Sequence, residues 1–68
     1  MQHSLRLPQE LKHFGNNYGE VSLIENPYPF SRYEVWMTRI DWEGWRRVLG
    51  TEDLSTARHL FGKAVHVL

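Results

Sequence analysis

Hydrophobic and polar positions alternate most clearly in the middle of the chain, over residues 32–50. Successive strand side chains point to opposite faces, so alternate residues of an extended segment line one side. Residues 41–44 place Asp first and Gly fourth, which is typical of a type I turn followed by a bulged glycine. The pattern predicts a β-hairpin with Met37 opposite Leu49. Its expected core face consists of Tyr33, Val35, Met37 and Leu49.

A further strand is predicted just upstream of this hairpin. Residues 20–25 include the β-branched Val21 and Ile24, which favour extended structure. Prolines at 27 and 29 favour an extended connection and disfavour a central strand there. These segments together predict a small antiparallel sheet of three strands over residues 20–50.

The C-terminal region carries a helical pattern. Asp53 is a suitable N-cap, and apolar residues follow it at alternating spacings of three and four. This spacing predicts a helix over about residues 53–66, packed on the sheet through one stripe. The stripe consists of Leu54, Ala57, Phe61, Ala64 and Leu68.

Gly62 leaves a second interpretation of this region open. It falls on the polar side of the stripe, where a helical glycine costs about 1 kcal/mol relative to alanine. In the alternative, the helix ends near Phe61, Gly62 caps it, and residues 63–68 form a short last strand. The continuous helix is favoured, and the sequence does not decide between the two.

The N-terminal part resembles an arm followed by a short helix. Pro8 suits a first helical turn and Gly15 suits a left-handed cap, so residues 8–14 are predicted to be helical. This segment would cover a sheet edge or lie over the second sheet face. The predicted fold is therefore a single α+β domain. Its parts are an arm and short helix (1–19), the sheet (20–50) and the C-terminal helix (51–68).

Composition narrows the function without naming it. The chain has 68 residues, no cysteine, and eight Lys and Arg against eight Asp and Glu. One domain and one small core are all that this length allows. The charge balance gives no whole-chain argument for binding nucleic acid or an anionic membrane. No apolar run is long enough for a membrane span or a signal peptide, so the expected location is cytoplasmic.

No motif predicts catalysis, a metal site or a cofactor. The serines stand in no nucleophile motif, and the five glycines are too scattered to form a phosphate-binding loop. The histidines form no HExxH or His-x-His pattern, and thiolate ligands are absent. We therefore expect a non-enzymatic protein whose four histidines are ordinary surface residues.

A cluster of tryptophan and arginine is the most unusual feature. Three tryptophans fall within ten residues, and arginines are interspersed with them. Trp42 is expected at an exposed turn tip, and Trp36 on the face opposite the core. Alternatively, the N-terminal segment covers Trp36. The candidate partner-binding residues are Trp36, Arg39, Trp42, Trp45 and Arg46.

Exposed aromatic and arginine residues are typical of binding surfaces. The first hypothesis is a small protein-binding module that docks on a larger partner through this hairpin. Inhibitors or adaptors of the phage or mobile-element type have this size. A second copy closing the same face would give a homodimer. The alternative is a single-stranded DNA or RNA binder using the same residues, which zero net charge disfavours.

Overall fold

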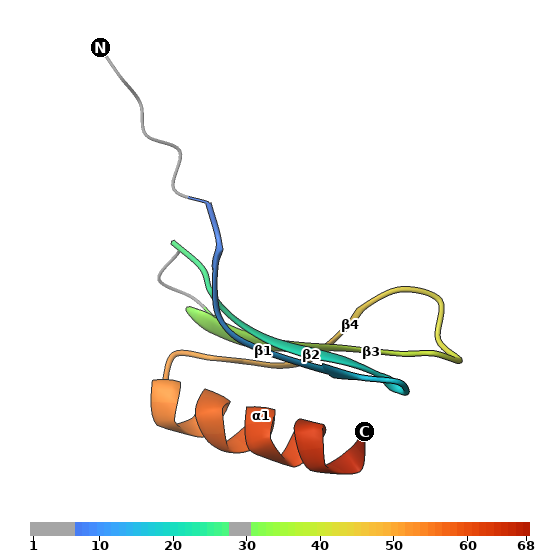
Figure 1. The fold of residues 1–68 in the computed structure, drawn as a ribbon. Coiled ribbons are helices and arrows are strands. Elements are labelled where there is room, and N and C mark those ends of the chain that lie inside the picture. The colour runs from blue at the N-terminus through green and yellow to red at the C-terminus, as the bar shows by residue number, and fades with distance from the viewer. Residues whose placement is uncertain (1–6, 28–30) are drawn as a thin grey trace.

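The computed structural model describes residues 7–27 and 31–68. It contains an antiparallel sheet whose four strands follow chain order, with one helix across one face (Figure 1). The predicted α+β class is confirmed, but the sheet has four strands rather than three. None of the helices in these two ranges has the length and apolarity to span a membrane. The elements are β1 (Gln9–Asn16), β2 (Gly19–Glu25), β3 (Tyr33–Arg39), β4 (Arg46–Thr51) and α1 (Leu54–Val67).

The extra strand is β1, and the prediction of a short helix over residues 8–14 is wrong. His13 pairs with Ser22 in β2, and Phe14 pairs with Val21. A helix of only two turns has few hydrogen bonds to offset its nucleation cost. The Asn16 side chain instead accepts hydrogen bonds from two backbone N–H groups and closes a β1–β2 hairpin. The predicted arm lies outside the described residues, except for residue 7.

The β3–β4 hairpin exists, but its register and loop differ from the prediction. Val35, not Met37, pairs with Leu49, and an irregularity in the pairing follows Val35. The loop is longer than a four-residue turn because β3 ends at Arg39 and β4 begins at residue 46. Gly44, the predicted bulged glycine, has a positive φ of 82°. The pairing of Leu49 is displaced by two positions, and an even displacement leaves its side chain on the predicted face.

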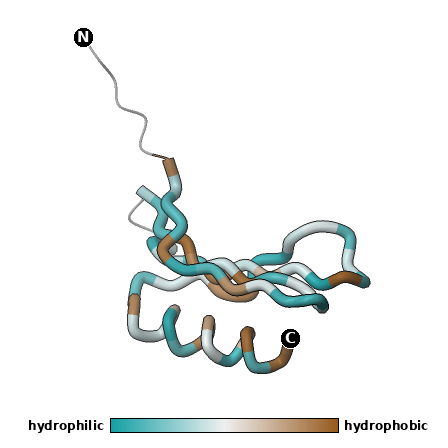
Figure 2. The backbone as a smooth tube through the Cα atoms, viewed as in Figure 1, coloured by the Kyte–Doolittle hydropathy of each residue, from teal (hydrophilic) through white to brown (hydrophobic). Residues whose placement is uncertain are grey.

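The core lies between the sheet and α1. Hydrophobic stretches run through the centre of the sheet and recur along the helix (Figure 2). Tyr33 of the predicted core face is half-buried and packs against this core, and Leu49 is also half-buried. The predicted apolar stripe of the helix does face the sheet. The buried residues are Val21, Leu23, Val35 and Met37 from the strands and Ala57, Phe61 and Ala64 from the helix.

The C-terminal helix is continuous, so the alternative of a last strand over residues 63–68 is wrong. Asp53 caps it as predicted, and its carboxylate accepts hydrogen bonds from the N–H groups of Ser55 and Thr56. Gly62 lies inside the helix on its exposed side. The alanines at 57 and 64 are buried against the sheet. The helix therefore covers one sheet face and leaves the other to be examined for function.

Candidate functional site

The sheet face opposite α1 is not covered by any segment in the described ranges (Figure 1). We call this the open face. Strand alternation places on it the side chains whose neighbours along each strand point into the core. It carries a mixture of aromatic, aliphatic and charged groups. Its residues are Glu10, His13, Glu20, Ser22, Ile24, Glu34, Trp36, Trp45 and Arg47.

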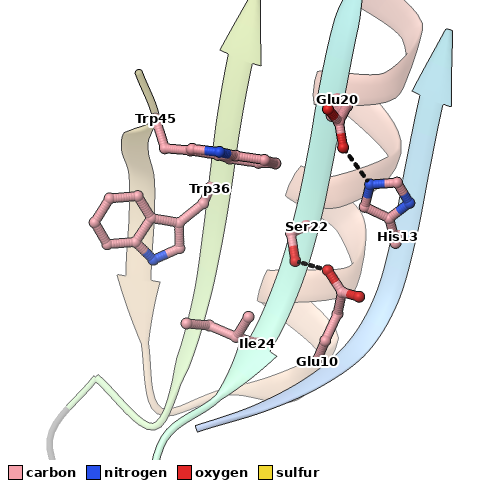
Figure 3. Close-up of a pocket in the computed structure, with 7 residues that line it drawn as sticks. All are labelled: Glu10, His13, Glu20, Ser22, Ile24, Trp36 and Trp45. Atoms are coloured by element: carbon pink, nitrogen blue, oxygen red, sulfur yellow. Dashed lines mark hydrogen bonds and ion pairs between the residues drawn. The ribbon is translucent and has the colours of Figure 1, made fainter.

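A shallow groove of about 370 Å³ crosses the open face. Figure 3 shows Trp36, Trp45 and Ile24 on one side of the groove. Strand pairing builds it, because three residues lie in one row across β1, β2 and β3. That row consists of His13, Ser22 and Trp36. The other side is polar and consists of Glu10, His13, Glu20 and Ser22.

Two hydrogen bonds hold the polar side in place (Figure 3). The buried hydroxyl of Ser22 donates to the Glu10 carboxylate. The imidazole Nε2 of His13 lies 2.8 Å from a carboxylate oxygen of Glu20. These contacts join β1 to β2, so the two carboxylates are positioned by the sheet itself. Each carboxylate keeps one oxygen that forms no contact within this network.

Glu34 orients the indole of Trp36. The Trp36 Nε1–H donates to one carboxylate oxygen at 3.0 Å, and Arg47 Nη1 donates to the other at 3.1 Å. Burial alone would raise the pKa of Glu34, but hydrogen bonds from Trp36, Asn26 and Arg47 outweigh it and lower that pKa. Glu34 is therefore ionised at neutral pH and holds two neighbouring side chains. This hydrogen bond restrains the Trp36 side chain, and a restrained side chain would lose less entropy on contact with a ligand.

The five predicted partner-binding residues do not form one surface. Trp36 and Trp45 lie on the open face, and Trp45 is 44% exposed. The expectation of an exposed Trp42 is wrong, because it is half-buried and packs against the core. The guanidinium of Arg46 lies 4.4 Å from the centre of the Trp42 ring. Arg39 donates to the carbonyl oxygen of Val67 in α1.

One interpretation of the sequence was that the N-terminal segment covers Trp36. The described residues of that segment do not cover it. β1 instead extends the sheet beside β2, and all eight of its residues are exposed. Phe14 pairs with Val21 and so points to the helix side of the sheet. Leu7 is 78% exposed. Residues 1–6 of the same N-terminal segment lie outside the described residues.

Sequence reasoning missed most of the groove. Glu10, His13, Glu20 and Ile24 were not among the candidate site residues. A helix over residues 8–14 would not place Glu10 and His13 beside β2. The available signal was the Asn-Asn-Tyr-Gly segment at 16–19, which is typical of a turn between two strands.

The outer strands are poorly suited to pairing with another chain. The pairing of β1 is irregular between Glu10 and Lys12, and that of β4 is irregular opposite Val35 and Trp36. Lys12 on β1 and the arginines of β4 add charge to these edges. Bulges and charged side chains are the usual means by which sheet edges avoid edge-to-edge association. The open face is therefore a better candidate for binding than either edge.

Another hollow lies on the outer side of α1 around Gly62. It is basic, with Arg58 and Lys63 at its margin, and the helix carries no acidic residue. Within residues 7–27 and 31–68, no three His, Asp or Glu side chains are arranged to hold a metal ion.

Comparison with known proteins adds no functional information. No protein-family model matches the sequence, and neither a curated protein nor a solved structure is significantly similar to it.

Proposed function

We propose that this protein is a non-enzymatic protein-binding module that docks on a larger partner through the open face. The observation that carries the proposal is the placement of Trp36 and Trp45 beside Ile24 along a groove that the core does not use. Tryptophan is among the residues most enriched where interfaces derive their binding energy. A protein of this size would act by occupying a partner's surface, as an inhibitor or an adaptor does.

The charge of the open face favours a protein partner over nucleic acid. Three carboxylates, from Glu10, Glu20 and Glu34, stand against the single guanidinium of Arg47. Phosphate contacts dominate nucleic-acid affinity, and an acidic surface repels them. The other arginines of the predicted cluster lie on the helix side, so they do not supply a phosphate-binding patch here.

The same charge disfavours a face-to-face homodimer. Such a dimer is isologous, so each copy would bring the same carboxylates to one interface. Like charges in a partly dehydrated interface oppose association. A partner of different composition therefore fits this face better than a second copy does.

The proposal is tested by comparing Trp45→Ser with Ile40→Ser. Both residues are exposed and apolar, but Ile40 does not line the groove. Proteins captured from a cell extract by tagged wild type and variants are quantified by mass spectrometry. The captured amount of a specific partner is expected to fall about tenfold or more with Trp45→Ser and to stay unchanged with Ile40→Ser. Equal capture by Trp45→Ser and wild type would contradict the proposal.

Two further measurements test whether the open face binds nucleic acid or a second copy of this protein instead. Tryptophan fluorescence is titrated with single-stranded DNA and RNA at low and moderate salt. Saturable, steeply salt-dependent binding that Trp45→Ser abolishes would support the nucleic-acid alternative instead. Sedimentation of the free protein at increasing concentration reports self-association. A dimer lost in Trp45→Ser would identify the second copy as the occupant and would contradict docking on a larger partner.

A further inference from the structure

We infer that the groove of the open face receives an arginine side chain of the partner protein. This inference rests on the proposed function and names the chemistry of the group that docks. It starts from the division of the groove into an aromatic side and a carboxylate side (Figure 3). Each side by itself is compatible with several ligands. Together they restrict the occupant to a group that is flat, partly apolar and positively charged.

The carboxylate side carries negative charge that the described residues leave largely uncompensated. Glu34 is paired with Arg47, and Glu25 outside the groove is paired with Arg32. Among residues 7–27 and 31–68, Glu10 and Glu20 form no ion pair with a lysine or an arginine. The Ser22 hydroxyl donates to Glu10, and the His13 imidazole contacts Glu20. A cationic group entering between the two carboxylates would gain charge-assisted hydrogen bonds.

The aromatic side is suited to the same cation. Tryptophan gives the strongest cation–π contacts, and guanidinium groups stack well on aromatic faces. The molecule already shows this contact elsewhere, where Arg46 lies over the ring of Trp42 on the helix side. An arginine laid against Trp36 or Trp45 would repeat that geometry and direct its N–H donors toward the carboxylates.

Size also favours a side chain over a larger ligand. Ligand pockets usually have volumes of about 300–1,000 Å³, so the groove is at the small end of this range. Arginine is preferred to lysine because its planar group offers several donors in a fixed fork and is more weakly hydrated. A guanidinium that stacks on an indole face can therefore still direct N–H donors toward the carboxylate side of the groove.

The inference is tested with Nα-acetyl-arginine amide as the probe and the matching citrulline compound as the control. Citrulline has nearly the same shape but no charge. Indole N–H signals are followed by nuclear magnetic resonance during titration. The arginine probe is expected to shift the signals of Trp36 and Trp45, with a Kd in the millimolar range, and to leave Trp42 nearly unchanged. Citrulline is expected to bind at least about fivefold more weakly.

Carboxylate variants locate the contact. Glu10→Gln and Glu20→Gln each remove a charge and keep an oxygen that can accept from Ser22 or contact His13, so both are expected to fold. Each should weaken arginine binding about threefold, and the double variant about tenfold. Glu52→Gln is the matched control, since Glu52 is exposed and outside the groove. Equal binding of arginine and citrulline, or no loss in the double variant, would overturn the inference.

The proposed function and the inference fail differently. If a captured partner is lost with Trp45→Ser but fully retained by the Glu10→Gln/Glu20→Gln double variant, the docking face is correct and the arginine assignment is wrong. If Trp45→Ser captures the partner as wild type does, the docking face itself is wrong. Loss of the captured partner in Trp45→Ser and in the double variant, with capture by Glu52→Gln unchanged, supports the docking face and the arginine assignment together.

Discussion

Replacing Gly62 with alanine is expected to stabilise the fold by about 1 kcal/mol. Gly62 lies inside α1 on its exposed side, and a Cβ added there meets no atom from another part of the molecule within 4 Å. The substitution therefore has no steric cost. Alanine loses less backbone entropy than glycine on entering a helix, by about 1 kcal/mol. For a domain of this size the midpoint of thermal unfolding should rise by about 4–8 °C.

Gly44→Ala provides the matched control. A Cβ at Gly44 also meets nothing within 4 Å, but its φ is +82°. A left-handed backbone costs a residue with a side chain about 1–2 kcal/mol. The same chemical change in equally open space should thus stabilise at one position and destabilise at the other.

Urea denaturation followed by circular dichroism measures both variants against wild type. If the midpoint urea concentration shifts while the slope of the free energy of unfolding against urea stays the same, the variant has changed stability. A neutral or lowered midpoint for Gly62→Ala would refute the reasoning, because it would mean that residue 62 is not helical in solution. The discarded interpretation, with a helix ending near Phe61 and a strand over residues 63–68, would then have to be restored.

Three further predictions concern the core, the tryptophans and the helix cap. Leu23→Ala removes a side chain that is 2% exposed and should cost about 2–5 kcal/mol, comparable with the whole stability of a small domain, as urea denaturation will show. Trp42→Ala should lower the thermal midpoint clearly, whereas Trp45→Ala should change stability by less than about 0.5 kcal/mol. The hydrogen bond from Thr56 lowers the pKa of Asp53 below its ordinary value of 3.8. The ionised cap therefore adds to the free energy of unfolding above that value, and this contribution is lost as pH falls through the folded pKa. Asp53→Asn should consequently lose less stability than wild type on acidification.

The hairpin over residues 32–50 and the C-terminal helix could be predicted because their patterns are local. Each buries one face, so burial leaves a period of two or of 3.6 in the sequence. β1 leaves no such period, since none of its residues is buried. Its Pro8 and Gly15 then imitate the start and end of a helix. Only the hairpin pairing with β2 makes this segment a strand.

The residues of the candidate site also fall into a part that the sequence predicts and a part that it does not. Alternation correctly places Trp36 opposite the core face, because that inference needs only the parity of neighbouring residues. Trp42 was misplaced because the loop is longer than a tight turn and lets this side chain pack against the core. The carboxylates of Glu10 and Glu20 join the site only through strand order, which the sequence pattern does not contain.

The groove lies on the sheet face that α1 does not cover. A single 14-residue helix covers one sheet face, and the described residues supply no second layer for the other. Trp45 consequently remains exposed beside the half-buried Trp36, and exposed aromatic surface on a small protein would promote nonspecific association. The adjacent carboxylates of Glu10 and Glu20 oppose that association, because any ligand must compensate their charge or displace their water. In the proposed docking, this arrangement disfavours purely apolar surfaces and favours a partner that brings a cation together with a flat apolar group.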